Sequence, residues 1–402
     1  MELKAYDFDK IVNRKGTGST KWDADPNLFI EDLDYKVDAE NILPLWIADM
    51  DFEVLPEIKE ALIKRASHGV FGYTEMSDKC YDAIINWEDT RHDFKVKREW
   101  LAFTSGAVTA AHVAVQAFTQ PGDKVIIQPP VYYPFYRTVS NNGANLLLNN
   151  LILNEKTGRY EIDFEDFENK AKDPRTVLFI LCSPHNPVCS VWTRGELERL
   201  AKICADNNVK VVADELHCDL VMPGFKHTAI ASLNDESLNN TVTIIAPSKT
   251  FNIAGIQATV NIIANDEMRQ KFNNALMRSS LMRLNLFAMT AMEAAFAHGA
   301  KWVDELINYI YENYKFLVKY SDEKLPKVKV MPLEGTYLAW LDFRAYKLSN
   351  YDLQKKMLTE AKLWLDEGYV FGDTASGFER VVLACPRSYI KEAVDRMAKA
   401  FN

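Results

Sequence analysis

Residues 241–255 read Thr-Val-Thr-Ile-Ile-Ala-Pro-Ser-Lys-Thr-Phe-Asn-Ile-Ala-Gly. The apolar first part, Thr241–Ala246, is typical of a buried strand, and the Ser/Asn/Gly-containing remainder is typical of the loop that follows one. This arrangement places Lys249 just beyond the end of a strand. A lysine in such a loop is most often solvated. In a desolvated, electropositive pocket, however, its pKa falls and the neutral amine can act as a covalent catalyst.

A second strand-like run ends in a carboxylate upstream of this lysine. Residues 209–217 read Val-Lys-Val-Val-Ala-Asp-Glu-Leu-His, and the β-branched part ends at Asp214. An aspartate after a strand most often caps the next helix. Together, Lys249 and Asp214 match what pyridoxal phosphate requires, because its ring accepts the electrons of a carbanion only when a carboxylate keeps the ring nitrogen protonated. We therefore expect pyridoxal 5'-phosphate as the cofactor and Lys249 as the catalytic residue.

Six motifs extend this pattern along almost the whole chain. They are Trp46-Ile-Ala-Asp-Met-Asp-Phe52, Phe71-Gly-Tyr-Thr74, Ser183-Pro-His-Asn-Pro187, Ala213-Asp-Glu-Leu-His-Cys-Asp-Leu220, Ala246-Pro-Ser-Lys-Thr-Phe-Asn-Ile-Ala-Gly255 and Ala384-Cys-Pro-Arg-Ser388. In this order and spacing they resemble the MalY/PatB-type C–S lyases (cystathionine β-lyases), which are fold-type I pyridoxal-phosphate enzymes related to the class I and II aminotransferases. The resemblance implies α,β-elimination of cystathionine, cysteine or cysteine S-conjugates to a thiol, pyruvate and ammonia.

The pattern between residues 100 and 290 predicts an α/β fold. Apolar runs alternate with helical stretches, which favours βα units and a mainly parallel sheet flanked by helices. A helix is expected over residues 194–205, with Thr193 as its N-cap. The expected strands are Lys124–Gln128, Leu146–Leu151, Val177–Cys182, Val209–Asp214, Thr241–Ala246 and Thr259–Ala264.

The carboxyl-terminal part has a different texture and predicts a smaller α+β domain. Long helices extend to about Tyr320, short strands are expected near Val328 and over Thr336–Asp342 and Val381–Cys385, and a helix over Tyr389–Phe401 ends the chain. The fold-type I resemblance implies a large cofactor-binding domain over residues 56–289, with residues 1–55 packing against residues 290–402. The active site is expected at the carboxyl ends of the parallel strands.

Composition excludes several classes of function. The net charge of −9 over 402 residues, without a basic stripe, argues against a nucleic-acid partner. No segment approaches the roughly 20 apolar residues of a membrane helix, and the first ten residues lack the apolar stretch of a signal peptide. The six cysteines show no framework spacing. We expect a cytoplasmic protein without a membrane partner.

One cluster of soft ligands raises the alternative of a metal site. Cys182, His185 and Cys189 could in principle bind a soft metal, but they offer three ligands rather than a closed set of four. The same segment contains the Ser-Pro-His-Asn-Pro motif, which the resemblance explains. No metal is therefore expected.

The resemblance also implies which residues bind the cofactor. The turn Gly106–Val108 (Gly106, Ala107, Val108) opens an apolar helix whose amides would bind the phosphate. The remaining implied cofactor-binding residues are Ser248 and Lys249 in the lysine loop, Tyr132 over the ring, Asn186 at its phenolic oxygen, Asp214 and His217 in the strand-end motif, and Tyr73 from a neighbouring subunit. A core tyrosine and a turn asparagine remain competing interpretations for Tyr132 and Asn186. The role of Tyr73 implies a homodimer with active sites at the interface.

Arg387 and Tyr337 are the implied substrate-binding residues, with Arg387 at the α-carboxylate through its bidentate guanidinium. The chain departs from the family pattern at Cys189 and Ser190, where a glycine and a basic residue are common. It also departs at Gln257, often basic, and at Val382, often asparagine. These differences leave the local turn and the strength of phosphate binding open.

Two other functions remain open at this level. An aminotransferase shares every step up to the carbanion and needs a 2-oxo acid as acceptor. A regulatory protein that keeps the fold to hold a transcription factor is the less favoured alternative, because Lys249, Asp214 and Arg387 are all present. The expected partner is thus a small sulfur amino acid.

Overall fold

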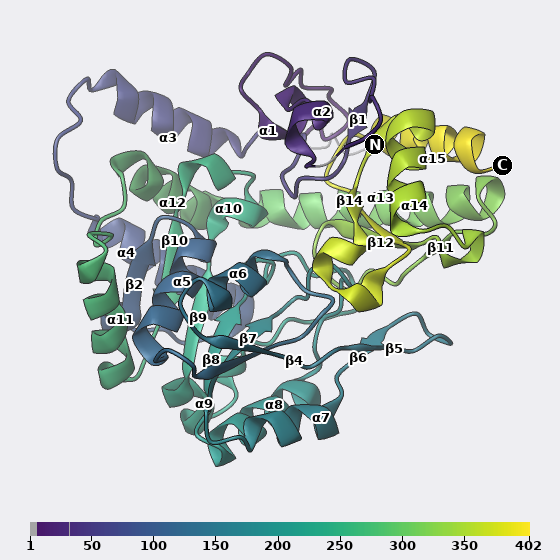
Figure 1. Ribbon diagram of the computed structural model, residues 1–402. Helices are drawn as coiled ribbons and strands as arrows, with labels where there is room; N and C mark the ends of the chain where they lie inside the picture. Colours follow the sequence, from purple (N-terminus) through teal and green to yellow (C-terminus); the bar gives the residue numbers. More distant parts are fainter. Residues whose placement is uncertain (1–5, 32) are drawn as a thin grey trace.

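A seven-stranded sheet forms the centre of the computed structural model, which describes residues 6–31 and 33–402 (Figure 1). The strand order is β2-β10-β9-β8-β7-β3-β4. β10 is antiparallel to both β2 and β9, and the other neighbours pair in parallel. The strands are β2 (Leu101–Thr104), β3 (Lys124–Ile127), β4 (Asn145–Leu148), β7 (Thr176–Cys182), β8 (Lys210–Asp214), β9 (Thr241–Ile245) and β10 (Thr259–Ile262).

Helices cover both faces of this sheet, which explains why its central strands are buried along nearly their whole length. On one face, α5 (Ala107–Phe118) packs against α11 (Asp266–Arg278), and α6 (Pro134–Ser140) lies beside α5. On the other face lie α7 (Phe164–Ala171), α8 (Arg194–Asp206) and α9 (Asp235–Asn240). Thr193 and Glu196 form a capping box that starts α8, as the sequence predicted.

A further helical layer surrounds the lysine loop. α12 (Leu286–His298) packs against α3 (Pro56–Ser67) and α4 (Asp78–His92), and it also contacts the short helix α10 (Pro247–Thr250) that carries Lys249. These helices share one apolar core with the long helix α13 (Ala300–Lys324) and the terminal helix α15 (Arg387–Phe401). The lysine loop is therefore anchored on the side opposite to the strands.

A smaller antiparallel sheet has the order β11-β12-β15-β14. Its strands are β11 (Lys329–Val330), β12 (Leu338–Asp342), β14 (Asp366–Glu367) and β15 (Phe378–Val382). The N-terminal β1 (Leu43–Pro44) pairs in parallel with β13 (Leu363–Trp364). Figure 1 accordingly shows α1 (Thr20–Asp23), α2 (Pro26–Phe29) and β1 beside the C-terminal elements, including α14 (Asn350–Lys356) and α15.

The remaining elements are short. β5 (Ile152–Leu153) and β6 (Tyr160–Glu161) form a hairpin. The 3-10 or π segments are η1 (Arg98–Trp100), η2 (Ile230–Ser232), η3 (Ala254–Ile256), η4 (Arg344–Tyr346), η5 (Met357–Ala361), η6 (Gly368–Phe371) and η7 (Asp373–Ala375). Within the described residues, no helix is long and apolar enough to cross a membrane.

The predicted α/β class and the six predicted strands of the large sheet are confirmed, with ends shifted by a few residues. One error bears on the site: the last strand was predicted over Val381–Cys385 and is found at Phe378–Val382. The ladder includes Glu379 and Arg380, two buried charged residues that the apolar pattern could not reveal. The helix that follows starts at Arg387. Arg387 is therefore the first residue of this helix, which was predicted to begin at Tyr389.

Candidate active site

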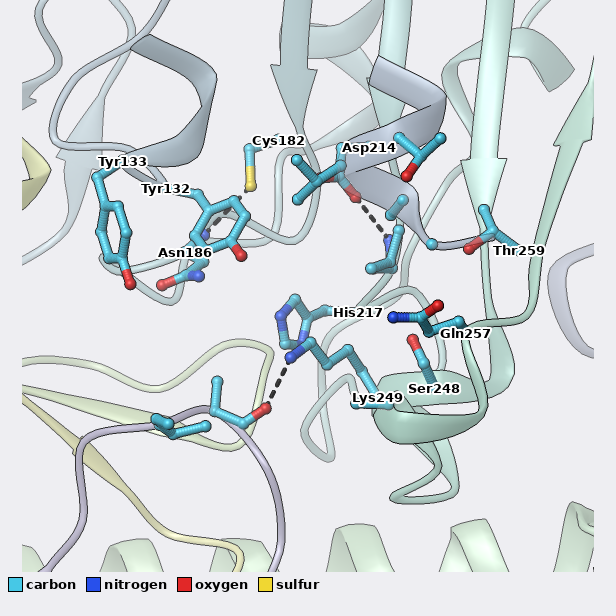
Figure 2. A pocket seen from close by; sticks show the side chains of 18 of the residues that line it. Tyr132, Tyr133, Cys182, Asn186, Asp214, His217, Ser248, Lys249, Gln257 and Thr259 are labelled. Carbon is cyan, nitrogen blue, oxygen red and sulfur yellow. Dashed lines mark hydrogen bonds between the residues drawn. The ribbon is translucent and has the colours of Figure 1, made fainter. Parts of the chain in front are cut away.

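A cavity of about 490 Å³ lies where β8 and β9 end. It is lined from the large sheet by Asp214, Lys249 and the start of α5, from the N-terminal segment by Trp46–Ala48, and from the small sheet by Arg380. Figure 2 shows the side chains that surround it. The predicted residues Gly106, Ala107, Val108, Tyr132, Asn186, Asp214, His217, Ser248 and Lys249 all line this one cavity.

Lys249 points across the cavity towards the N-terminal segment. Its Nζ donates a hydrogen bond of 2.7 Å to the carbonyl oxygen of Ala48 (Figure 2). Burial lowers the pKa of Lys249 to about 8, and the positive charge of Arg380 acts in the same direction. Asp49 and Asp214 oppose this shift. A substantial share of the Lys249 side chains is thus neutral in mildly alkaline solution, which a nucleophilic or basic amine requires.

Ala48 lies in a segment that is held by buried ion pairs. Arg14 binds Asp49 through both terminal nitrogens and also reaches Asp51, while Lys21 pairs with Asp51 at 2.6 Å. Tyr337 on the small-sheet side donates to the same Ala48 oxygen at 2.7 Å. Tyr337 is fully buried and does not line the cavity. The position of the Lys249 amine therefore depends on the N-terminal segment as well as on its own loop.

Asp214 lies at the end of β8, on the side of the cavity next to the start of α5. Its Oδ1 accepts a 3.3 Å hydrogen bond from the backbone N–H of Leu216. Burial raises the pKa of Asp214 to about 7, and this one donor and the charge of Lys249 only partly oppose the shift. A cationic group bound beside it would favour the ionised form. The protonated ring nitrogen of pyridoxal phosphate is such a group.

Three further predicted residues define the walls of the cavity. Burial lowers the pKa of His217 to about 3, which keeps its ring neutral, and the ring packs edge-on against Tyr337 with centroids 5.6 Å apart. Tyr132 follows β3 and lines the cavity, and burial raises its pKa. Asn186 is almost fully buried and accepts a 3.0 Å hydrogen bond from Arg380 Nη1.

The N-terminus of α5 forms an anion-binding turn. Gly106 adopts φ +103°, a conformation that L side chains rarely adopt, and α5 begins at the next residue. The residues of this first turn line the cavity together with Ser105, Ser248 and Gln257, and their backbone N–H groups have no partner within the helix. With a hydroxyl on each side, this donor set fits a phosphate group. The cavity as a whole therefore fits pyridoxal 5'-phosphate between α5, Asp214 and Lys249.

The structure corrects the prediction for Arg387. Arg387 opens α15 outside the cavity, and its Nε donates to Asn313 Oδ1 at 3.1 Å. The arginine that reaches the cavity is Arg380, which is 2% exposed, donates to Trp46 O at 2.8 Å and pairs with Asp366. The physical reason is that the strand ends at Val382, before the Ala-Cys-Pro-Arg motif.

Two other predicted features have defined places. Tyr73 is 97% exposed and does not line the cavity of its own chain, so its role towards a second subunit stays a prediction. Cys189 adopts φ +62°, the left-handed conformation that favours the glycine common in the family. Its buried thiol lies 3.3 Å from Leu338 O, and burial raises its pKa to about 12. Cys189 therefore takes the backbone conformation that a glycine would take there, and its buried side chain favours the neutral thiol over the thiolate.

A group of potential metal ligands lies elsewhere. Among the described residues, His92, Cys218 and Asp219 form the cluster that could hold an ion. Asp219 is already engaged by the Nε1 of Trp87, the Nε2 of His92 and the hydroxyl of Thr250, at 2.7–3.0 Å. This network fixes the residue that follows Lys249.

Comparison with known proteins agrees with this geometry. The family model for aminotransferase class I and II matches residues 40–397. The cystathionine β-lyase PatB of Bacillus subtilis is 46% identical over 98% of this chain and its own full length, and the protein MalY of Escherichia coli is 30% identical over 99% of both chains. The crystal structure of cystalysin from Treponema denticola, which contains pyridoxal 5'-phosphate, superposes with a TM-score of 0.93 at 37% identity, covering 99% of both chains. The chain therefore belongs to the aminotransferase class I and II family, together with PatB and MalY.

Proposed function

We propose that this protein is a pyridoxal-phosphate-dependent C–S β-lyase. In the proposed reaction, a cysteine S-conjugate and water give a thiol, pyruvate and ammonia. The observation that carries the proposal is the convergence of Lys249, Asp214 and Arg380 on one cavity beside the anion-binding turn of α5. The 46% identity to a relative named cystathionine β-lyase supports the choice of reaction.

The cofactor would be held at both of its ends. The α5 turn with Ser248 and Gln257 would bind the phosphate, Asp214 would face the ring nitrogen, and Tyr132 would lie against the ring. When bound, pyridoxal phosphate supplies an aldehyde that bonds to amines and a ring that accepts electrons from the substrate Cα. The raised pKa of Asp214, near 7, means that its charge develops most readily beside a cation.

Lys249 would transfer the proton at Cα. Its lowered pKa, about 8, lets the neutral amine exist near physiological pH, and the same amine can afterwards return a proton. The carbonyl of Ala48, 2.7 Å from Nζ, orients the amine when it is protonated. Tyr337 therefore acts as a positioning residue through Ala48 and not as a direct substrate ligand.

Arg380 would bind the substrate α-carboxylate, the role that the family resemblance implies for Arg387. Its guanidinium donates hydrogen bonds to Asn186 Oδ1 and Trp46 O, which fix the planar group in the wall of the cavity. Asp366 also pairs with it, so an incoming carboxylate competes with Asp366 for the same charge. Burial raises the pKa of Asp366, which eases this exchange because a protonated Asp366 no longer requires the ion pair.

The proposal extends to assembly and location. We propose a cytoplasmic homodimer in which Tyr73 completes the phosphate site of the partner subunit. Tyr73 is 97% exposed, and the neighbouring Phe71 is also exposed and packs its ring 5.8 Å from Phe287 on α12. Such exposed aromatic side chains favour an interface. We also propose that residues 56–289 form the cofactor-binding domain and that residues 1–55 and 290–402 form the smaller domain.

The decisive experiment measures pyruvate from L-cystathionine without any 2-oxo acid. Continuous release by the wild-type protein, lost in Lys249→Ala and kept in the surface variant Lys271→Ala, supports the lyase. Lys271 is a suitable control because it makes only an exposed ion pair with Glu267. Turnover that appears only after a 2-oxo acid is added would instead identify an aminotransferase.

A further inference from the structure

A second cavity opens beside the first. It has a volume of about 620 Å³ and shares Phe29, Trp46, Tyr133 and Asp366 with the cavity that contains Lys249. Tyr133 appears at the margin of the first cavity in Figure 2, away from Gln257. The two spaces are thus adjacent compartments with a common wall. Asp366, which pairs with Arg380, lines both of them.

The common wall is aromatic. Trp46 and Trp364 stack with ring centroids 4.1 Å apart and planes inclined by 8°. Phe29 packs edge-on against both, at 4.9 and 5.6 Å. Polarisable sulfur makes favourable contacts with aromatic rings, so this wall suits a thioether at the junction of the two cavities.

The far side of the second cavity carries charges of both signs. Arg137 is exposed, lines the cavity, and forms no ion pair or side-chain hydrogen bond with any residue of the described chain. Glu367 accepts a 2.9 Å hydrogen bond from Gln354 Nε2 but has no cationic partner among those residues. Across the ladder, Glu367 faces Glu379, whose Oε1 has no hydrogen-bond partner. Two facing acidic side chains with one neutral donor form a site where a cation would stabilise the ionised form.

We propose that this second cavity binds the distal α-amino-acid group of the substrate, with Arg137 at its carboxylate and Glu367 at its ammonium group. Arg137 and Glu367 would then be the residues that distinguish thioethers carrying a second amino-acid group from those without one. This inference rests on the proposed lyase function and makes it specific. Burial raises the pKa of Glu367 to about 7, which agrees with a carboxylate that lacks its cation.

The test compares four substrates that differ only in the distal arm. L-cystathionine carries both groups, S-(3-carboxypropyl)-L-cysteine lacks the amine, S-(3-aminopropyl)-L-cysteine lacks the carboxylate, and S-methyl-L-cysteine lacks the arm. Arg137→Ala is expected to lower kcat/KM only for the two substrates whose distal arm carries a carboxylate, L-cystathionine and S-(3-carboxypropyl)-L-cysteine. The expected loss is about tenfold, which corresponds to one charge-assisted hydrogen bond. Glu367→Gln is expected to lower kcat/KM only for the two substrates whose distal arm carries an amine, L-cystathionine and S-(3-aminopropyl)-L-cysteine.

Arg194→Ala serves as the matched control, because this exposed arginine lines neither cavity. An equal loss on all four substrates in either variant would overturn the subsite. Calorimetric titration of L-cystathionine into wild-type and Arg137→Ala protein gives a reading that does not require turnover. If the wild type releases no pyruvate from any substrate, the lyase proposal fails, while weaker binding of L-cystathionine by Arg137→Ala alone would still support the subsite. Equal binding by both proteins would overturn it.

Discussion

Lys249 and Tyr337 donate hydrogen bonds to the same carbonyl oxygen, that of Ala48, each at 2.7 Å. The three residues come from three parts of the chain: the segment after β9, the residue before β12 of the small sheet and the N-terminal segment. One backbone oxygen therefore joins the large sheet to the smaller one at the catalytic amine. The Tyr337 hydroxyl competes for this oxygen and so weakens its hydrogen bond with the protonated Lys249. Burial already lowers the pKa of Lys249 to about 8.

The shared acceptor predicts the effect of Tyr337→Phe. Without the competing hydroxyl, Ala48 O accepts from Lys249 alone, which stabilises the protonated amine and raises its pKa by up to about one unit. Acetic anhydride labelling of Lys249 against pH, read by mass spectrometry in protein freed of cofactor, measures this pKa. Tyr133→Phe is the control, because Tyr133 lines the cavity without contacting Ala48. A lowered pKa in Tyr337→Phe would contradict the argument.

A pair of arginine variants separates the two candidates for the substrate carboxylate. Arg380→Lys loses a bidentate, buried guanidinium and is expected to lower kcat/KM about 100-fold, equivalent to nearly 3 kcal/mol. Arg387→Lys is expected to stay within about threefold of wild type, because Arg387 lies at the start of α15 outside the cavity. Steady-state pyruvate release with both variants decides between them. A large loss of kcat/KM in Arg387→Lys alone would show that Arg387, and not Arg380, binds the substrate carboxylate.

Much of this site could be predicted because its residues follow strands. Asp214 is the last residue of β8, Lys249 lies four residues beyond the end of β9, and the turn before α5 follows β2. In a mainly parallel sheet, such positions converge at one edge. The predicted strand ends were good to a few residues, which is enough to bring these side chains together.

Arg380 and Ala48 could not be predicted in the same way. Arg380 is a charged residue inside a buried strand, where the pattern of apolar residues gives no sign of it. The one available signal was a lone Glu-Arg pair between Phe378 and Val381, which is unusual for a buried strand. Ala48 acts through its carbonyl oxygen, which every residue type has, so the sequence cannot reveal this role. Tyr73 concerns a second subunit and stays a prediction.

The raised pKa of Asp214 predicts a pH-dependent stability in the cofactor-free protein. Its pKa is about 7 in the folded chain and about 3.9 when unfolded. The folded state therefore binds more protons between these values, and the stability contribution, complete below about pH 4, is lost as the pH rises through 7. Asp214→Asn removes this loss. Calorimetry measures the melting temperature of the variant minus that of the wild type. This difference is expected to be at least about 1–2 °C larger at pH 8 than at pH 5. A constant difference would show that Asp214 is ionised throughout.

The buried network beside the lysine gives a last prediction. Thr250 donates a 2.7 Å hydrogen bond to Asp219 Oδ2, while Trp87 and His92 occupy Oδ1. Thr250→Val leaves that buried oxygen without a donor, which is expected to cost about 1–2 kcal/mol of unfolding free energy. Urea unfolding measures this cost against Thr90→Val, an exposed threonine whose hydroxyl bonds only to Asn86 O of its own helix. Because Thr250 adjoins Lys249, the variant should also lower kcat while KM stays nearly constant. Unchanged stability in Thr250→Val would mean that Asp219 holds its charge without the threonine, and that the lysine loop is fixed by α12 packing alone.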